Sequence, residues 1–407
     1  MSKKSPQLRF EGFTDAWEER KLSSGLREYT DRVIVEDDKE YYQISVRNNF
    51  GGITLRGSKM GNKIGRKRQA KINLTKYPQT LIFTRQTVEQ GGIGWVDKYC
   101  DGAIVTENMP TISLDTSVFS KYFLTNLFQT RIFYKNAILD NIEGGSAQIA
   151  IHESKFLSST LLFPNLDEQE KIGQFFKQLD DTIDLHQRKL DLLKEQKKGY
   201  LQKMFPKNGA KVPELRFAGF ADDWEERKLK ELGDIQTGNT PPTSDSDNYS
   251  LDGVLWVTPT DIKSLVISNT AKKLSQVGVA KARIAKAGSI LVTSIASIGK
   301  NTLLRMDAGF NQQINSLTPT SENDSYFLLT QSEKWSEKMK QTAASATMQI
   351  VNKTDFSNIS TYVPVHKEEQ EKIGSFFKQL DDTIALHQHK LDLLKEQKKG
   401  FLQKMFV

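Results

Sequence analysis

The chain is poor in cysteine and in long apolar runs. Cys100 is its single cysteine, which excludes an internal disulfide and favours a reducing compartment. No run approaches the ~20 apolar residues that a membrane-spanning helix needs. The opening residues, MSKKSPQLRF, lack the apolar segment of a signal peptide. We therefore expect a soluble, cytoplasmic protein.

Complete catalytic motifs are lacking as well. The segment 52–59, GITLRGSK, resembles a phosphate-binding loop, but its lysine follows the serine instead of preceding it. In GGIGWVD at 91–97, Asp97 occupies the place of the third glycine of a dinucleotide fingerprint. Five histidines and one cysteine supply no zinc-binding set. The sequence therefore predicts a chain that does no catalysis itself and binds no metal or cofactor.

The charge balance is moderately basic. Lys and Arg total 57 and Asp and Glu total 50, so the net charge is +7 over 407 residues. A polyanionic partner is one explanation, and an ordinary lysine-rich surface is the other. Because the total does not separate these, the placement of the bases has to be considered. The length allows two or three domains.

Two long segments of the chain are nearly the same. Residues 167–205 match 368–406 at 34 of 39 positions. A shorter segment, 6–22, matches 213–229 at 13 of 17 positions. Internal repetition of this kind indicates a repeated structural unit. The chain is thus two half-proteins, each consisting of a short motif, a variable block and a long motif.

A fainter third repeat precedes each long copy. It consists of Gln148-Ile149, Phe156 and Pro164 in the first half, with Gln349-Ile350, Phe356 and Pro364 in the second. We therefore expect six segments: a repeat segment at 1–22, a variable domain at 23–164, a helix at 165–206, a repeat segment and linker at 207–229, a second variable domain at 230–365 and a second helix at 366–407.

Both long copies carry the 3.5-residue period of a coiled coil. Seam positions alternate at spacings of four and three residues. In the first copy they are Ile172, Phe176, Leu179, Ile183, His186, Leu190, Leu193, Lys197, Tyr200 and Met204. In the second they are Ile373, Phe377, Leu380, Ile384, His387, Leu391, Leu394, Lys398, Phe401 and Met405. The histidines and lysines are expected to set the register of the pairing.

Local signals define the ends of the first helix. Asn165 followed three residues later by Glu168 is typical of an N-terminal cap, and Pro206 stops the helix. About 37 residues at ~1.5 Å each give a rod of roughly 55 Å. A helix with one apolar stripe needs a partner. We expect the other copy in the same chain to pair with it in antiparallel fashion, and pairing between two chains is the alternative.

The variable blocks mix strand-like and helical patterns. The expected strands are 79–87, 102–114, 253–263 and 288–306, and the expected helices are 120–134 and 334–344. Each block is therefore interpreted as a small α+β domain. The fold class is α+β, with two such domains separated by two long helices that form an antiparallel, pseudo-two-fold coiled coil.

Bases are clustered in the first block. The segment 56–71 contains seven bases and no acid, and its glycines suit a loop. The bases are Arg56, Lys59, Lys63, Arg66, Lys67, Arg68 and Lys71. Such a run is often only solvated, but contact with phosphates is a fair competitor, since phosphate neutralisation dominates nucleic-acid affinity. A weaker set in the second block comprises Lys272, Lys273, Lys281, Arg283 and Lys286.

Taken together, these features resemble the specificity subunit of type I restriction–modification systems over essentially the whole chain. The resemblance rests on the duplicated EQEKIG-x-FFKQLDDTI segments and, in the second block, on GNTPPTSDSDNY at 238–249, WVTPTDIK at 256–263 and NQQIN at 311–315. The first block departs from this pattern, because NMPTI at 108–112 stands where Asn-Gln-x-Ile is expected.

The resemblance implies two target recognition domains that each recognise one half of a split, asymmetric double-stranded DNA site. It implies helices that set the spacing and bind two methyltransferase subunits, with restriction subunits in the full complex. It also implies that S-adenosylmethionine, ATP and Mg are bound by those partners and not by this chain.

For the DNA contacts, we expect the bases of segment 56–71, together with Lys281 and Arg283, to contact phosphates. Candidates for base contact are Arg85, Gln86, Thr240, Gln312 and Gln313. For the pair Gln312 and Gln313, a buried amide that braces the domain is the alternative. Two other functions remain open: a stand-alone DNA methyltransferase or nuclease, and a coiled-coil scaffold with no role at DNA.

Overall fold

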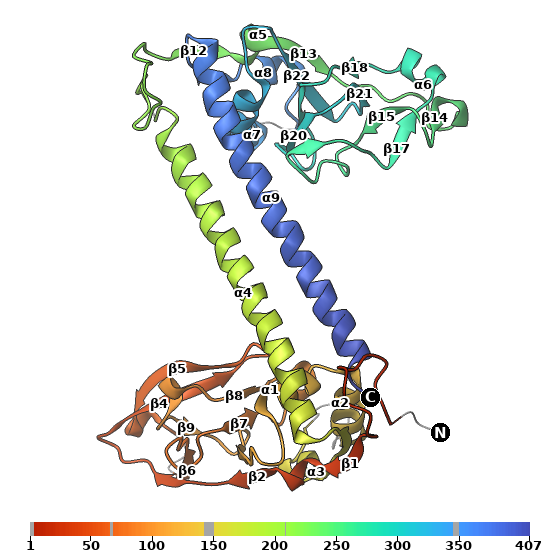
Figure 1. Ribbon diagram of the computed structural model, residues 1–407. Helices are drawn as coiled ribbons and strands as arrows, with labels where there is room; N and C mark the ends of the chain where they lie inside the picture. The colour runs from red at the N-terminus through yellow and green to blue at the C-terminus, as the bar shows by residue number, and fades with distance from the viewer. Residues whose placement is uncertain (1–3, 66–67, 142–149, 208, 345–349) are drawn as a thin grey trace. The chain divides into compact units, whose positions relative to one another are not determined.

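The computed structural model describes residues 4–65, 68–141, 150–207, 209–344 and 350–407 (Figure 1). Two compact units divide the chain: unit 1 is Met1–Gln187 with His389–Val407, and unit 2 is Arg188–Gln388. Each unit therefore contains one variable block and a part of each long helix, whereas the sequence led us to treat each helix as a separate segment.

The two long helices have the expected extents. Helix α4 spans Leu166–Lys203 and helix α9 spans Lys367–Lys404, 38 residues each. The backbone N–H of Glu168 donates to Oδ1 of Asn165 at 2.9 Å, which confirms the predicted cap. Helix α4 ends three residues before Pro206, as predicted.

In unit 1 the two helices pair in antiparallel fashion. The rings of Phe175 and Phe401 meet edge to face at 5.0 Å. One turn further along α4, Asp180 Oδ1 lies 2.7 Å from Nζ of Lys398, which precedes Phe401 on α9. The residue numbers thus rise on one helix as they fall on the other, so these helix segments run in opposite directions.

The same pairing recurs in unit 2. Tyr200 and Phe376 meet edge to face at 4.9 Å, and Lys197 Nζ lies 2.6 Å from Asp381 Oδ1. The polar seam lysines therefore form interhelical ion pairs, consistent with a role in setting the register. In both units the seam closes within one chain, which confirms the expected pairing and not its alternative.

Burial agrees with the predicted seam. The aliphatic seam residues and the two seam phenylalanines of the first turns are buried or half-buried: Ile172, Phe176, Leu179, Ile183, Leu190, Leu193, Ile373, Phe377, Leu380, Ile384, Leu391 and Leu394. Tyr200, near the end of α4, is an exposed seam residue.

Unit 1 is built on two main sheets. The first has the order β2 (Leu26–Tyr29), β10 (Thr111–Leu114), β7 (Thr80–Phe83), β8 (Ile93–Trp95). The second has the order β3 (Arg32–Ile34), β6 (Arg68–Lys71), β9 (Ile104–Val105), β4 (Glu40–Val46), β5 (Ile53–Met60). A two-stranded sheet pairs β1 (Glu18–Lys21) with β11 (Thr160–Phe163).

Short helices complete unit 1. They are α1 (Lys121–Leu127), α2 (Arg131–Phe133) with a π-helical turn at Tyr134–Ile138, and α3 (Glu153–Ser158). The predicted helix 120–134 is thus interrupted after Phe128, and a new helix starts where the Thr130 hydroxyl accepts the backbone N–H of Phe133 at 3.1 Å.

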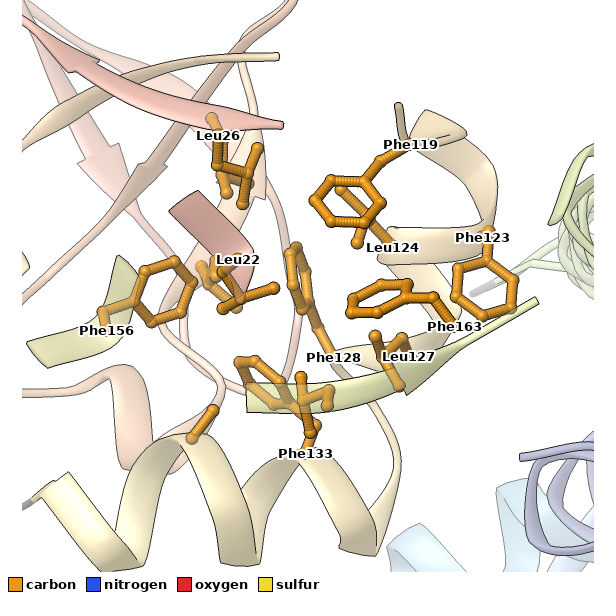
Figure 2. Close-up of a cluster of buried hydrophobic side chains, with 14 of the residues drawn as sticks. Leu22, Leu26, Phe119, Phe123, Leu124, Leu127, Phe128, Phe133, Phe156 and Phe163 are labelled. Carbon is orange, nitrogen blue, oxygen red and sulfur yellow. The ribbon is translucent and has the colours of Figure 1, made fainter. Parts of the chain in front are cut away.

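The core of unit 1 is rich in aromatic side chains (Figure 2). Phe163 of β11 lies between Phe119 and Phe123, with ring centroids 4.4 and 6.0 Å away. The end of α9 reaches this core, since Phe406 lies 5.2 Å from Phe123 and 6.4 Å from Trp17. A segment from the far end of the chain therefore completes the core of the first variable block.

Unit 2 repeats this plan. One sheet has the order β13 (Gly233–Thr237), β22 (Ile314–Pro319), β19 (Ile290–Thr293), β20 (Asn301–Leu304), β16 (Val266–Ile267). The other has the order β14 (Tyr249–Ser250), β17 (Lys272–Leu274), β15 (Val254–Val257), β21 (Ala308–Phe310), β18 (Ile284–Ala285). Strands β12 (Glu225–Lys228) and β23 (Ser360–Val363) pair separately.

The helices of unit 2 are α5 (Leu229–Leu232), α6 (Gln276–Lys281), α7 (Ser325–Ala344) and α8 (Lys353–Ser357). The predicted helix 334–344 is the second half of α7, and the strand expected at 288–306 is the hairpin β19–β20. Phe205, just beyond α4, stacks on Phe327 at 5.7 Å and lies 5.8 Å from Trp224. Phe205 thus has the same place in unit 2 as Phe406 has in unit 1.

The expected loop at 56–71 is wrong for most of that segment. Its first five residues, 56–60, belong to β5, and its last four, 68–71, form β6. The residues of β5 from Leu55 to Met60 are exposed. Pairing explains this: β5 pairs along its whole length with β4, and Gly57 (φ 124) lies at a register shift of that pair. The glycine indicates a bulge in a strand here.

Candidate nucleic-acid interface

The predicted phosphate contacts of unit 1 lie on β5 and in the turn after it. Arg56 and Lys59 are exposed on β5, and Lys63 is exposed in the 3-10 turn Gly61–Lys63. Lys71, the last residue of β6, is half-buried. Arg68 is the first residue of β6. Arg66 and Lys67, like Gln148-Ile149 and Gln349, lie outside the described residues.

Arg85 follows β7 and is tied to a buried acid. Its Nε donates to Oε2 of Glu153 at 2.8 Å, and the Glu153 side chain is 8% exposed. The guanidinium compensates a carboxylate that burial would otherwise make costly. Gln86, the next residue, is exposed. Of the two candidates, Gln86 therefore has the freer side chain.

A cleft of about 860 Å³ opens beside Arg85, between the two sheets of unit 1. Glu28, Arg32 and Glu107 line it together with Arg85. Burial, and secondarily the negative charge of Glu153, raises the pKa of Glu28. The cleft thus presents both hydrogen-bond donors and acceptors, the chemistry that base edges require.

In unit 2 the base-contact candidates lie together. The Thr240 hydroxyl is hydrogen-bonded to the amide oxygen of Gln312, and Nδ2 of Asn311 donates to the same hydroxyl at 3.2 Å. The backbone N–H of Gln313 donates to Oδ1 of Asn311 at 2.8 Å. Gln312 is exposed, so the buried-amide alternative is wrong for this residue, while Gln313 is half-buried.

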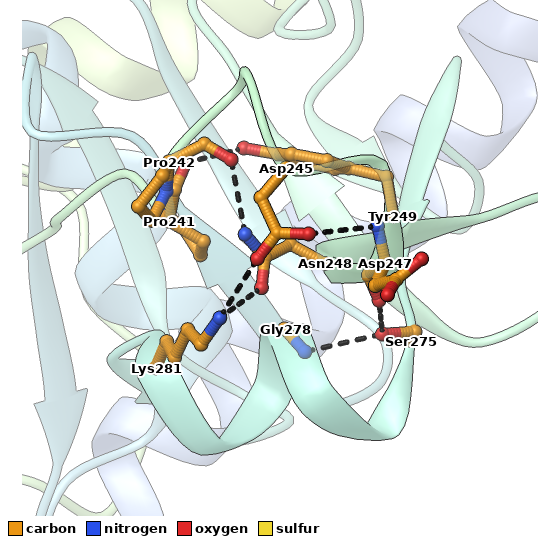
Figure 3. A network of polar contacts seen from close by, with 9 residues as sticks. All are labelled: Pro241, Pro242, Asp245, Asp247, Asn248, Tyr249, Ser275, Gly278 and Lys281. Carbon is orange, nitrogen blue, oxygen red and sulfur yellow. Dashed lines mark hydrogen bonds and ion pairs between the residues drawn. The ribbon is translucent and has the colours of Figure 1, made fainter.

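The loop that carries Thr240 is held by a polar network (Figure 3). Asn248 is fully buried; its Nδ2 donates to the Pro242 carbonyl at 3.0 Å and its Oδ1 accepts from Lys281 Nζ at 2.8 Å. The Tyr249 hydroxyl donates to the Pro241 carbonyl at 2.8 Å. Both prolines next to Thr240 are thereby fixed, and the side chain of Thr240 is placed before any ligand binds.

The two predicted bases of this region have intramolecular partners. Lys281 Nζ lies 3.1 Å from Oδ2 of Asp245, and its hydrogen bond lowers the pKa of that carboxyl. Arg283 donates from Nη1 to the Thr237 carbonyl at 2.5 Å, and its backbone N–H donates to Oδ1 of Asn239 at 2.6 Å. Both residues therefore support the Thr240 loop, and contact with DNA phosphates stays a prediction for them.

Equivalent hydrogen bonds align the two units. In unit 1 the N–H of Arg85 donates to the Asn108 carbonyl, and in unit 2 the N–H of Ser294 donates to the Gln313 carbonyl. Asn108 therefore corresponds to Gln313. The position of Gln312 is taken by Glu107, so the Asn-Gln-x-Ile position lies two residues earlier in unit 1 than we expected.

Two features of unit 1 were missed from the sequence. Glu153 is 68 residues from its partner Arg85, and no local pattern links the two. The turn Asn48–Gly51 joins β4 to β5, and its residue types, Asn-Asn-Phe-Gly, could have indicated a tight hairpin turn.

Among the described residues, no group of three or more His, Cys, Asp or Glu side chains could hold a metal ion. Within the same residues, no helix is both long and apolar enough to cross a membrane.

Two units that share the order of their central strands, each with polar side chains held just beyond the end of a strand, define the fold of a two-module recognition protein. The chain belongs to the family described as the type I restriction modification DNA specificity domain, whose model matches residues 17–195 and 221–396. This confirms the resemblance drawn from the sequence.

Several known proteins are similar to the chain. It is 26% identical over 181 residues to the type I restriction enzyme MjaIX specificity subunit of Methanocaldococcus jannaschii, covering 43% of this chain and 41% of that protein. It is 29% identical over 170 residues to the HindI specificity subunit of Haemophilus influenzae, covering 40% and 37%. The matched region thus spans about two fifths of the length of these relatives.

Solved structures support the fold. The S subunit of a type I restriction-modification system from M. genitalium matches with a TM-score of 0.67 at 12% identity, over 99% of both chains. A chain from a structure of type I R-M complex assembly and conformational transition matches with a TM-score of 0.51 at 18% identity, over 96% of this chain and 97% of that one. The α+β class with two modules and two long helices is therefore confirmed.

Proposed function

We propose that the chain is the non-catalytic, sequence-specific DNA-binding subunit of a type I restriction–modification complex in the cytoplasm. Each unit recognises one half of an asymmetric, bipartite site in double-stranded DNA. The observation that carries the proposal is that the two units share the order of their central strands but differ in the side chains at equivalent places: Arg85 and Glu107 in unit 1 correspond to Ser294 and Gln312 in unit 2. Different donors and acceptors at equivalent places select different bases.

Exposed lysine and arginine side chains support a second kind of DNA contact, one that does not depend on the base sequence. Arg56, Lys59 and Lys63 are exposed along β5 and its following turn. Contacts of this type orient a protein on the duplex and supply much of its salt-dependent affinity, while side chains at base edges provide selectivity.

The helices are proposed to set the spacing of the two half-sites. A 38-residue helix is about 57 Å long at ~1.5 Å per residue. That length suits two half-sites separated by about one DNA turn, ~34–36 Å. The base pairs between them would not be recognised.

The same helices are proposed to bind two copies of a methyltransferase subunit. Both helices carry strongly exposed leucines at equivalent positions: Leu185 (66%) and Leu192 (52%) on α4 correspond to Leu386 (65%) and Leu393 (51%) on α9. The recurrence of exposed leucines at the same places of both copies suits a surface that two copies of one partner cover. Restriction subunits would join this assembly, and the partners would bring S-adenosylmethionine, ATP and Mg.

The proposal is tested by sequencing methylated adenines in a host that expresses the chain with its methyltransferase partner. The expected result is a single motif with two different halves and an unspecified gap. A continuous or palindromic motif would contradict the proposal. The purified chain alone, given DNA with S-adenosylmethionine or Mg, should neither methylate nor cut it; either activity would favour a stand-alone enzyme.

The leucine contact is tested by the double substitution Leu185→Glu and Leu386→Glu. Charges in an apolar contact should lower the number of bound methyltransferase subunits below two, measured by native mass spectrometry. Leu251→Glu is the control, because Leu251 is 92% exposed but lies in the variable block of unit 2. An unchanged stoichiometry in the double variant would exclude these leucines as the contact.

A further inference from the structure

The turn that joins β4 to β5 contains an aromatic residue in an unusual conformation. The N–H of Gly51 donates to the Asn48 carbonyl at 3.1 Å, and the residues between them, Asn49 and Phe50, have φ of 55° and 56°. Positive φ at both central residues is the pattern of a type I′ hairpin turn, which strongly favours glycine at the second position. Here Phe50 occupies that position.

The turn is held in place by the loop between β7 and β8. The N–H of Asn49 donates to the Gln90 carbonyl at 2.7 Å, and the N–H of Phe50 donates to the Gly91 carbonyl at 3.0 Å. Nδ2 of Asn48 also donates a hydrogen bond to the side-chain amide oxygen of Gln90 at 2.7 Å. This loop also contains Arg85 and Gln86, so the aromatic residue is fixed on the element that carries the base-contact candidates of unit 1.

One edge of the Phe50 ring lies against Gly91, and the residue keeps a solvent-exposed surface. Phe50 is 42% exposed. Arg47, which flanks the turn, and Arg56 on β5 are both exposed. A hairpin that carries exposed basic side chains and a partly exposed aromatic residue complements a polyanion with apolar base faces.

Unit 2 has a different structure at the equivalent place. Its strands β15 and β17 correspond to β4 and β5, but residues 258–271 join them, and part of that segment forms β16 on the other sheet. The turn is therefore a feature of unit 1 alone among the described parts of the two units. A structural feature that lets the two units recognise different half-sites is expected where the two units differ.

We propose that Phe50 is a specificity-determining residue of unit 1, whose ring makes an apolar contact with a base of the DNA half-site that this unit recognises. The inference rests on the proposed function. The turn fixes the ring in advance, so little conformational freedom is lost when it contacts DNA. Arg47 and Arg56 contact the adjacent phosphates.

The test compares Phe50→Gly and Phe50→Tyr in the full chain assembled with its methyltransferase partner. Glycine suits the positive φ, so the first variant removes the ring and keeps the turn. The second keeps an aromatic ring. Leu251→Gly, an exposed apolar residue of unit 2, is the matched control.

Two readouts are used: the methylated-adenine motif in cells, and binding of a duplex with the wild-type motif against a scrambled duplex. For Phe50→Gly we expect at least tenfold weaker binding to the motif duplex, unchanged binding to the scrambled one, and a degenerate position in one half of the motif. Phe50→Tyr and Leu251→Gly should stay within twofold of wild type.

An unchanged motif and unchanged binding ratio in Phe50→Gly would overturn the inference. Phe50→Asn, a second residue that tolerates positive φ, should repeat the loss. If neither variant folded, the ring would be a packing residue and the inference would fail. A wild-type complex with no bipartite motif would instead contradict the proposed function, so the two failures are distinguishable.

Discussion

One buried ion pair in each half of the chain joins the short repeat segment to the start of the long helix. Nε and Nη2 of Arg9 each donate to a different carboxylate oxygen of Glu168, both at 2.7 Å, and the Glu168 side chain is fully buried. Arg216 makes the same bidentate contact with Glu369. Hydrogen bonding to Glu168 raises the pKa of Arg9. The repeated sequence motif thus has a specific role at residue level.

Arg9→Ala should destabilise unit 1 by about 3–5 kcal/mol, because it leaves the Glu168 carboxylate buried without a partner. Urea unfolding with residue-level hydrogen exchange measures the loss and its location. The double variant Arg9→Ala with Glu168→Gln should lose less, since it removes the unpaired charge too. A single variant as stable as wild type would show that Glu168 finds water or another partner.

The space around each glycine of the long helices shows whether another backbone packs against the helix at that position. A Cβ on Gly173 of α4 would lie 2.8 Å from the backbone nitrogen of Phe123 in α1. On α9, Gly374 has the same relation to the nitrogen of Phe327 at 2.8 Å. By contrast, Gly199 of α4 has no heavy atom within 4 Å of such a Cβ. Backbone contact therefore requires glycine at only some of these positions.

Gly173→Ala and Gly199→Ala are accordingly expected to have opposite effects. The first should destabilise unit 1 by about 1–3 kcal/mol, because the backbones of α1 and α4 must separate. The second should stabilise the helix by about 0.5–1 kcal/mol, because alanine loses less entropy on folding. Denaturant midpoints of the two variants give the comparison, and equal shifts would contradict it.

For single helices and strands, prediction from the sequence succeeded where a residue pattern extended over many positions. The seam residues from Ile172 to Leu193 repeat over several heptads and the Asn165 cap is local, so α4 could be predicted to within a few residues. Segment 56–71 could not, since β5 depends on pairing with β4. In the candidate interface, the proximity of Thr240 and Gln312 was not visible in the sequence, and Arg85 was assigned without its partner Glu153.

On the scale of the whole molecule, each unit takes part of its core from the other half of the sequence. Phe406 lies in the core of unit 1 with Trp17 and Phe123, and Phe205 lies in the core of unit 2 with Trp224 and Phe327. The two phenylalanines are equivalent residues of the long repeat. They offer a matched pair of substitutions that address one unit each.

Phe406→Ala should destabilise unit 1 by about 3–5 kcal/mol, and Phe205→Ala should do the same to unit 2, because each leaves a cavity among aromatic side chains. Hydrogen exchange measured by mass spectrometry should show lost protection in strands β7 and β10 for the first variant and in β19 and β22 for the second. The same pattern of loss in both variants would contradict the assignment.

The discontinuity of unit 1 has a consequence for synthesis on the ribosome. Chains commonly fold domain by domain from the N-terminus as they emerge. Unit 2 is the uninterrupted stretch Arg188–Gln388, whereas unit 1 needs His389–Val407 to be complete. Unit 2 can therefore reach its final packing before Phe406 has joined Trp17 and Phe123, and the variable block that is translated first is the last to complete its core.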